Sequence, residues 1–210
     1  MAISPGSTLV DYVVPARASR SSNLIKDGLL IVGFSVFLAL CAQVSFYLPF
    51  TPVPITLQTL AVLLTGAALG SRRGGLAMLV YLAEGAVGLP VFAGGAGGFI
   101  KLFGFTAGYL WAFPIAAFVV GLLCERRLER KFLTSVLVML VGSLIIYAIG
   151  VSWLAVVLHV DLLKAFALGM LPFIPGDIVK IVFAALLLPI AWSIVRAAKP
   201  ERSDRGATGL

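Results

Sequence analysis

Six apolar stretches, each about long enough to cross a lipid bilayer, take up most of this 210-residue chain. A hydrocarbon core about 30 Å thick requires roughly 20 consecutive apolar residues in a helix. The stretches cover residues 29–48, 53–69, 76–92, 110–123, 132–158 and 178–195. This pattern predicts an all-α integral membrane protein with six transmembrane helices.

The basic residues between these stretches predict how the chain is oriented. Of the 16 Lys and Arg residues, most lie in alternate connections, on one face of a six-helix arrangement. The residues on that face are Arg17, Arg20, Lys26, Arg72, Arg73, Arg126, Arg127, Arg130, Lys131, Arg196, Lys199, Arg202 and Arg205. The opposite face keeps Lys101, Lys164 and Lys180. Because cytoplasmic connections carry the excess of Lys and Arg, we expect both termini in the cytoplasm. A five-helix arrangement would divide the basic groups between the two faces, so the charge pattern favours six.

Composition excludes most other classes of protein. Hydrophobic residues make up 60% of the chain and charged residues 12%, whereas soluble domains carry roughly 25% charged residues. We expect a cytoplasmic N-terminal segment at 1–27, a membrane domain at 28–195 and a disordered cytoplasmic tail at 196–210. Residues 1–23 lack the apolar core of a cleaved signal peptide. The basic residues of the predicted cytoplasmic connections account for the net charge of +7. The sequence shows no basic surface interleaved with aromatic residues, which a nucleic-acid-binding protein would require.

The sequence lacks the common motifs of enzymes and metal sites. It has no Gly-x4-Gly-Lys-Ser/Thr loop for ATP, no His-Glu-x-x-His pair and no Gly-x-Ser-x-Gly turn. His159 is the only histidine. Cys41 and Cys124 fall near opposite faces of the predicted membrane domain, so they indicate neither a disulfide nor a metal site. We therefore expect a protein that is not an enzyme, with no metal and no cofactor.

Three connections on the predicted outer face gather the residues that are suited to binding. The first, 49–58, holds three prolines, which stiffen an extended backbone. The second, 88–104, is rich in glycine, and the third, 159–177, ends in Pro-Gly-Asp. Non-helical backbone at membrane depth must line a cavity or be buried in protein. The glycines allow the backbone to approach a ligand closely, but they equally suit a mobile lid.

Asp177 and Lys180 form the most informative polar pair. They lie at the start of the sixth stretch with an i, i+3 spacing, which places them on one face of a helix. An ionisable residue in a membrane span is by default a candidate functional residue. The alternative is structural: Asp177 would cap the helix, and Lys180 would extend outward to the membrane surface.

Two further sets of residues have open interpretations. Glu84 is the only acidic residue in the interior of a predicted span, and it either bonds to a neighbouring helix or takes part in proton coupling. Five aromatic residues with a polar atom are spread over the helices: Tyr81, Tyr109, Trp111, Tyr147 and Trp153. They form either a wall for a flat ligand or anchors at the level of the lipid headgroups.

Three motifs, in this order and on one predicted face, resemble those of a known family. They are Thr51-Pro-Val-Pro-Ile-Thr-Leu-Gln58, Gly88-Leu-Pro-Val-Phe-Ala-Gly-Gly95 and Pro172-Phe-Ile-Pro-Gly-Asp-Ile-Val-Lys180. Over roughly residues 28–195 the chain resembles BioY, the biotin-binding membrane subunit of energy-coupling factor (ECF) transporters. The resemblance implies six helices in the bacterial plasma membrane and one biotin site open to the outside. It also implies a transmembrane coupling protein and a pair of ATPases as partners, although some members occur without a dedicated ATPase module.

The resemblance also implies which residues bind the ligand. Asp177 would accept hydrogen bonds from the two N–H groups of the ureido ring of biotin. Lys180 would pair either with Asp177 or with the biotin carboxylate. The other implied site residues are Gln58, Gly95, Ala96, Gly97 and Tyr109.

The chain departs from the family pattern at two places. Some members carry an Asn between the two glycine pairs and an Arg after Gly-Tyr, where this chain has Ala96 and Leu110. Lys101 is a candidate to replace that Arg. The Ala-x-x-x-Ala motif of the first helix, which often contacts the coupling protein, is Ser35-x-x-x-Ala39 here. Two rival functions stay open: uptake of another small vitamin or a biotin precursor, and a membrane scaffold that transports nothing.

Overall fold

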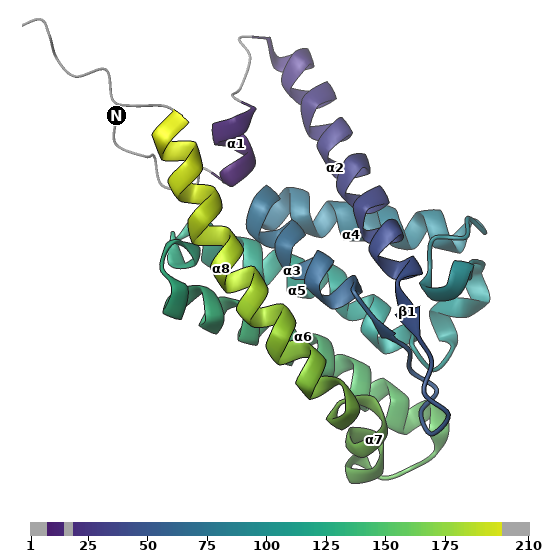
Figure 1. Ribbon diagram of the computed structural model, residues 1–210. Coiled ribbons are helices and arrows are strands. Elements are labelled where there is room, and N and C mark those ends of the chain that lie inside the picture. The colour runs from purple at the N-terminus through teal and green to yellow at the C-terminus, as the bar shows by residue number, and fades with distance from the viewer. Residues whose placement is uncertain (1–7, 15–18, 199–210) are drawn as a thin grey trace, which may run out of the picture.

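A computed structural model describes residues 8–14 and 19–198 of the chain. It is mostly helical, as the sequence predicts (Figure 1). The helices are α1 (Leu9–Val13), α2 (Arg20–Gln43), α3 (Gln58–Leu69), α4 (Ser71–Ala86), α5 (Ala107–Glu125), α6 (Phe132–Leu158), α7 (Leu162–Gly169) and α8 (Ile174–Ala198). Four short 3-10 helices lie in the connections: η1 (Ala93–Gly95), η2 (Phe99–Phe103), η3 (Leu128–Arg130) and η4 (Leu171–Phe173).

Four segments within the described residues are long and apolar enough to cross a membrane. They are Ser21–Gln43, Ala107–Glu125, Phe132–Leu158 and Leu162–Val195. The remaining two predicted spans correspond to α3 and α4, which have 12 and 16 residues. Both are shorter than the roughly 20 residues that a bilayer requires. Helix length therefore supports a multi-pass protein with four clear spans, and the count of six stays a prediction.

One short hairpin, which the sequence did not predict, interrupts the mostly helical fold. Strand β1 (Ser45–Phe46) pairs with β2 (Ile55–Thr56) in antiparallel register. The predicted first stretch therefore ends too late and the second begins too early. The prolines between the strands, at positions 49, 52 and 54, stiffen the connecting loop and are unfavourable inside a helix, in keeping with the later start of α3. This hairpin brings the loop between α2 and α3 back over one end of the molecule.

Residues without bulky side chains allow the central helices to pack closely. Gly70 alone separates α3 from α4, and its φ of +83° is in the region that favours glycine. A methyl group added at Gly66 of α3 would lie 2.4 Å from the carbonyl oxygen of Ala117 on α5. These contacts require small residues, as is common between membrane helices.

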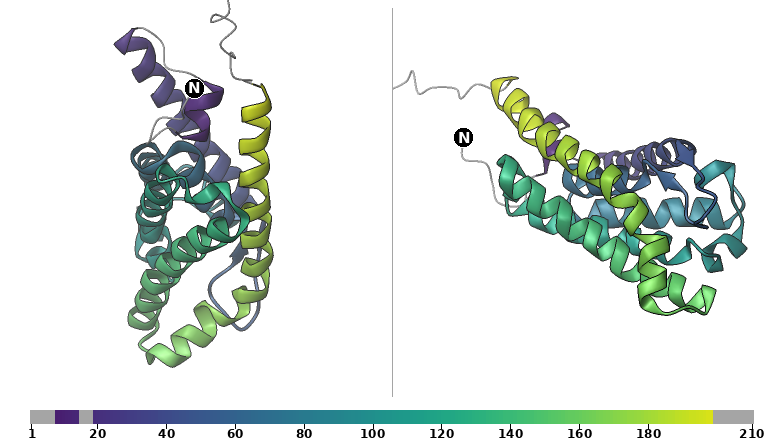
Figure 2. Two further views of the ribbon diagram at one scale, coloured as in Figure 1. Left: turned by 90° about the vertical axis from the view of Figure 1, so that its left-hand side faces the viewer. Right: turned by 60° about the horizontal axis from the view of Figure 1, so that its bottom comes forward.

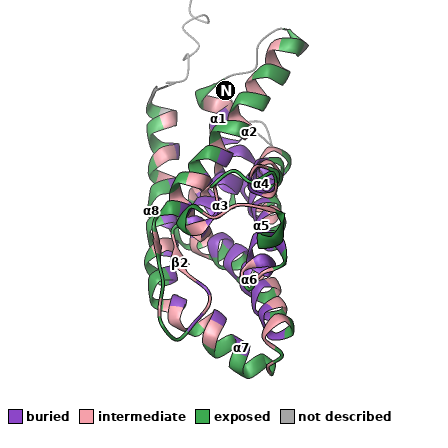
Figure 3. Ribbon diagram, turned by 90° about the vertical axis from the view of Figure 1, so that its right-hand side faces the viewer, coloured by how far each residue is buried: buried purple, intermediate pink, exposed green. Residues whose placement is uncertain are grey.

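Burial divides the helices into a central group and a peripheral group. The buried residues gather on α3, α4, α5 and the inner face of α6, whereas α2 and α8 expose much of their outer surface (Figure 3). Large apolar side chains on these two helices are exposed, for example Leu29 (70%), Leu40 (65%), Val179 (68%) and Ile194 (62%). Apolar exposure of this extent is typical of helices that face lipid.

Charged residues near the start of α4 hold α1 against the membrane domain. Arg73 donates a hydrogen bond to Asp11 Oδ2 at 2.7 Å and another to Asp27 Oδ1 at 3.2 Å. Burial works against ionisation of Asp11, but hydrogen bonds from Arg73 and Thr8 outweigh it and hold the pKa of Asp11 below its usual value. This α1 lies within the predicted N-terminal segment, near the C-terminal end of α8 and far from α7 (Figures 1 and 2).

Part of the predicted topology falls on residues outside the described ones. Arg17 and the tail from residue 199 are not described. Arg73 and Arg130, in contrast, lie at the end of the molecule that holds α1, where Arg130 stacks 4.2 Å from the ring centre of Trp192. The opposite end holds the hairpin, α7 and the segment 88–106 (Figure 2), and this is where a cavity opens.

Candidate functional site

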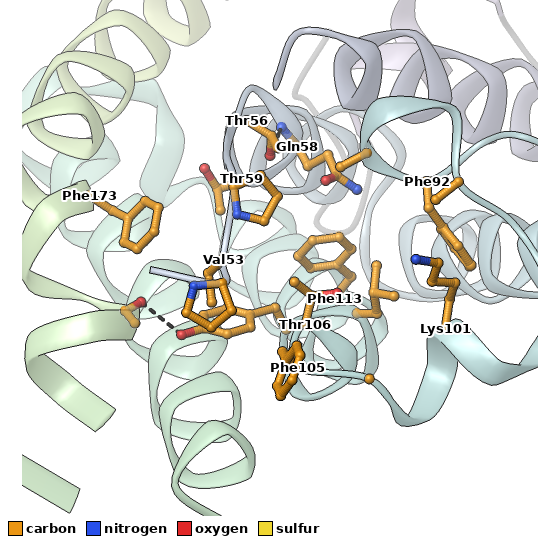
Figure 4. Close-up of a pocket in the computed structure, with 18 of the residues that line it drawn as sticks. Val53, Thr56, Gln58, Thr59, Phe92, Lys101, Phe105, Thr106, Phe113 and Phe173 are labelled. Carbon is orange, nitrogen blue, oxygen red and sulfur yellow. Dashed lines mark hydrogen bonds between the residues drawn. The ribbon is translucent and has the colours of Figure 1, made fainter. Parts of the chain in front are cut away.

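A cavity of about 360 Å³ lies between the hairpin, the segment 88–106 and the start of α8 (Figure 4). This volume is within the range of small-molecule sites. Its apolar wall comes from several elements and includes Val53, Phe92, Phe105, Phe113 and Phe173. The polar and charged side chains in the wall are Tyr47, Thr56, Gln58, Thr59, Lys101, Thr106, Tyr109, Tyr147, Asp177 and Lys180. An apolar cavity with a few converging polar groups is the usual form of a ligand site.

Asp177 is the central acidic group of this cavity. It is buried, with 7% of its surface exposed. Lys180 donates to Asp177 Oδ1 at 2.9 Å, and the hydroxyl of Tyr147 donates to Oδ2. Lys180 also donates to the hydroxyl oxygen of Thr59 at 3.1 Å. The carboxylate is therefore held from α6 and α8, and its lysine partner is fixed to α3.

Asp177 is the fourth residue of α8, which begins at Ile174, so it is not the N-cap; it does lie in the first turn, where an acidic residue suits the positive end of the helix. An N-cap residue precedes the first helical residue. The outward interpretation of Lys180 is wrong, since its ammonium group bonds to Asp177 and Thr59. The prediction that Asp177 and Lys180 share a helix face is correct.

Two of the five aromatic residues fit the interpretation as a cavity wall, whereas anchoring at the lipid headgroups stays a prediction. Tyr109 and Tyr147 line the cavity with edge-to-face geometry, their ring centres 6.3 Å apart. The hydroxyl of Tyr109 donates to the carbonyl oxygen of Gly169 at 2.7 Å. In contrast, Trp111 and Trp153 donate from their indole nitrogens to backbone carbonyls of the segment that ends near Gly104. The tryptophans therefore fix this segment rather than line the cavity.

Gln58 lies at the first position of α3 and lines the cavity. Its side-chain amide donates to the hydroxyl oxygen of Tyr81 at 2.8 Å, and the Tyr81 hydroxyl donates to the carbonyl oxygen of Val91 at 3.0 Å. Gln58 is thus held in place by a chain of hydrogen bonds that reaches the glycine-rich segment.

The glycine-rich segment forms a folded turn. Gly94, Gly95 and Gly98 adopt φ values of +67°, +71° and +98°. Phe92 N–H donates to the carbonyl oxygen of Ala96 at 2.9 Å, so the turn closes on itself. Of the three site residues predicted here, Ala96 lines the cavity, whereas Gly95 and Gly97 do not. Their role is to permit the turn that presents Ala96.

The two positions at which we expected a departure from the family pattern both line the cavity. They hold Ala96 and Leu110, which supply no polar side-chain group. Lys101, on η2, also lines the cavity and points toward its interior below Phe92 (Figure 4). Lys101 thus belongs to the same site as Asp177 and Lys180.

Glu84 lies outside the cavity lining. Ser35 of α2 donates to Glu84 Oε1 at 3.0 Å, so the interpretation that Glu84 bonds to a neighbouring helix is correct. Ser35 is fully buried in this contact. Cys41 and Cys124 are free thiols, and the described part of the chain contains no group of three or more His, Cys, Asp or Glu residues arranged to hold a metal ion.

Comparison with known families places this site in context. The sequence model of the BioY family matches residues 15–197, which is most of the chain. The chain belongs to the BioY family. The matched range includes the hairpin, the cavity and all predicted site residues. It begins after α1, so α1 lies outside the matched range, whereas Arg73, the partner of Asp11, lies inside it.

Relatives in the BioY family match most of this chain. The probable biotin transporter BioY of Pyrococcus horikoshii is 44% identical over 162 residues, which are 77% of this chain and 93% of the relative. The biotin transporter BioY of Thermotoga maritima is 42% identical over 165 residues, which are 79% of this chain and 92% of the relative.

One solved structure has the same fold as this BioY family member. It is a crystal structure of the S component for biotin from an ECF-type ABC transporter, with a TM-score of 0.76 and 25% sequence identity. The match covers 84% of this chain and 95% of the solved chain. Both chains therefore share one fold over most of their length.

Proposed function

We propose that this protein captures biotin at the outer face of a bacterial plasma membrane and mediates its uptake as the S component of an ECF transporter. The observation that carries the proposal is the buried Asp177, held by Tyr147 and Lys180 in an apolar cavity. Membership of the BioY family supports biotin as the ligand. The S component would bind biotin and perform no chemical reaction on it, without a cofactor.

The chemistry of the cavity is suited to a neutral ureido ring. A ureido group presents two N–H donors, and an ionised carboxylate accepts up to four hydrogen bonds. Asp177 uses two of these for Tyr147 and Lys180, so acceptor capacity remains for the ligand. We propose that the N–H groups of biotin bind Asp177, while Gln58 and Tyr109 border the ring and Ala96 contacts it from the glycine-rich turn.

The rest of the site would enclose the apolar part of biotin. Phe92, Phe113 and Phe173 project into the cavity from three different elements (Figure 4). Burial of apolar surface contributes about 25 cal/mol for each Å² removed from water. We propose that Gly95 and Gly97 act indirectly, by shaping the turn that carries Ala96.

The topology that we propose has six membrane-embedded helices, α2, α3, α4, α5, α6 and α8, with both termini in the cytoplasm. The basic residues near α1 and η3 support this orientation. The membrane domain would extend over about 28–195, between a cytoplasmic segment at 1–27 and a tail at 196–210. The helices α3 and α4 are short, and the hairpin would complete the crossing next to α3.

The partners that we propose are a transmembrane coupling protein and a pair of ATPases. Ser35 of the Ser35-x-x-x-Ala39 motif is buried against Glu84. A coupling surface on α2 would therefore use residues that are exposed, such as Gly33, Val36 and Leu40. The open space around Gly33 would allow another helix to approach closely.

A thermal-shift screen over water-soluble vitamins tests the proposed function. A ligand present at 100 times its dissociation constant stabilises the folded state by about 2.7 kcal/mol. We expect biotin to raise the melting temperature of the purified protein, and other vitamins to leave it unchanged. Stabilisation by a different vitamin alone would assign the cavity to that vitamin. No stabilisation by any vitamin would favour a scaffold without a ligand.

A further inference from the structure

The cavity carries more positive than negative charge. Three charged side chains line it within the described residues: Lys101, Asp177 and Lys180. The two lysines and one aspartate leave a formal charge of +1 facing the interior. A cavity wall with a net positive charge favours an anionic ligand, because opposite charges attract each other even where a lysine such as Lys101 is exposed to solvent.

Lys180 does not supply this excess charge. Its ammonium group lies 2.9 Å from Asp177 Oδ1 and donates at 3.1 Å to Thr59. The two charges compensate each other within one helical turn. A ligand carboxylate placed beside Lys180 would also lie beside Asp177 and be repelled by it. The neutral part of the ligand therefore belongs at the Asp177 end.

Lys101 has no such partner. No ion pair joins it to an acidic residue in the part of the chain that the structure describes. It lies on η2, which packs against α4 and α5, and its side chain points toward the interior (Figure 4). From the structure we infer that Lys101 binds the carboxylate of the ligand and so makes the cavity selective for a monoanion. This inference rests on the proposed function, in which biotin supplies that carboxylate.

The positions of the two ends fit an elongated ligand. Phe173 and Lys101 lie on opposite sides of the cavity (Figure 4), and Asp177 follows Phe173 by about one helical turn. A molecule with N–H donors at one end and a carboxylate at the other would span from Asp177 to Lys101. Ala96 and Leu110, which also line the cavity, are apolar, so they cannot compete with Lys101 for the carboxylate.

The alternative for Lys101 is a lysine that merely extends to the membrane surface. A pair of ligands separates the two roles: biotin, and biotinamide, in which an uncharged amide replaces the carboxylate and the ureido ring is unchanged. Affinities of both would be measured with the purified full-length protein, for the wild type and for Lys101→Met. The matched control is Lys164→Met, since Lys164 is an exposed lysine on α7 that does not line the cavity.

We expect the wild type to bind biotin about fivefold more tightly than biotinamide, the upper range for an ion pair with an exposed lysine. Lys101→Met should bind both ligands equally, with unchanged affinity for biotinamide, which also reports that the variant is folded. Lys101→Arg should restore the preference, and Lys164→Met should keep it.

Three results would overturn the inference. The first is a preference for biotin that persists in Lys101→Met. The second is an equal loss of affinity for both ligands in that variant, since this indicates a structural role. In these first two results the wild type still binds biotin, so the proposed function stands and only the role of Lys101 is removed. The third result, a wild type that binds neither ligand, removes the proposed function itself and the inference with it.

Discussion

The hydroxyl of Tyr147 on α6 donates a hydrogen bond to Oδ2 of Asp177 on α8, 30 positions further along the chain. Lys180 occupies the other carboxylate oxygen. The aspartate is thus fixed by one neutral and one charged donor before any ligand arrives. A binding group that is already oriented loses less conformational freedom on binding, which favours affinity.

Replacement of Tyr147 by phenylalanine tests this orientation. Hydrogen bonds to charged groups contribute about 1.5–3 kcal/mol, and part of that should be lost from ligand binding when the carboxylate is less well held. We expect Tyr147→Phe to weaken biotin binding by about tenfold, as measured by isothermal titration calorimetry. Tyr47→Phe is the control, because the Tyr47 hydroxyl also bonds at the cavity rim, to the carbonyl of Ala93, but does not reach Asp177. Equal effects of the two substitutions would contradict the role of Tyr147.

The ion pair between Arg73 and Asp11 predicts how stability depends on pH. The folded protein holds the pKa of Asp11 below its usual value, so the pair stabilises the folded state above the unfolded pKa of about 3.9. This contribution is lost as the pH falls through the still lower folded pKa. Because Asp11 is partly exposed, the effect should be at most about 1 kcal/mol.

The measurement compares thermal stability of the wild type and Arg73→Met between pH 7 and pH 3. We expect a constant difference from pH 7 to pH 5 that shrinks below about pH 4. Arg72→Met provides a matched control, because Arg72 is exposed and we expect no pH-dependent difference. A gap between wild type and Arg73→Met that is the same at pH 3 and pH 7 would refute the role of Asp11.

Single cysteines at four positions test the proposed orientation in the membrane. In a background without Cys41 and Cys124, we expect cysteines at positions 72 and 127 to react only from the cytoplasmic side. Cysteines at positions 101 and 164 should react only from outside. A membrane-impermeant maleimide applied to intact cells makes this distinction. Labelling at position 127 from outside would contradict the topology that the basic residues predict.

Local sequence spacing predicted part of the site correctly. Asp177 and Lys180 are three residues apart on one helix, and this spacing alone brings them together. Their contact with Tyr147 was not predictable in the same way, since it depends on how α6 packs against α8. The sequence offered Tyr147 only as one of several aromatic residues with two interpretations.

Helix boundaries were predictable where apolar stretches end in charged residues. The stretch at 132–158 matches α6 because basic residues precede it and His159 follows it in the left-handed conformation. The predicted end of the stretch at 29–48 was wrong, because Val44, Phe46 and Leu48 are as apolar as the residues of the helix before them. Hydropathy cannot distinguish such residues in a hairpin from those in a helix.

The glycine-rich segment shows a different limit of sequence reasoning. Four glycines near Ala96 suited either close approach of the backbone to a ligand or a mobile lid, and Gly95 and Gly97 do not line the cavity. A methyl group added at Gly97 would lie 2.4 Å from the carbonyl oxygen of Leu89. Gly97 therefore lacks a side chain because the turn packs tightly against Leu89. The sequence alone does not reveal this contact.

The central claim is that Asp177 binds the ligand directly, and equilibrium binding of biotin to Asp177→Asn tests it best. An ionised acceptor contributes about 1.5–3 kcal/mol to a hydrogen bond. We therefore expect the affinity of Asp177→Asn to fall by about tenfold to over a hundredfold, with the helical circular dichroism signal unchanged. Unchanged affinity in a well-folded Asp177→Asn protein would contradict the assignment of Asp177 as the group that binds the ligand.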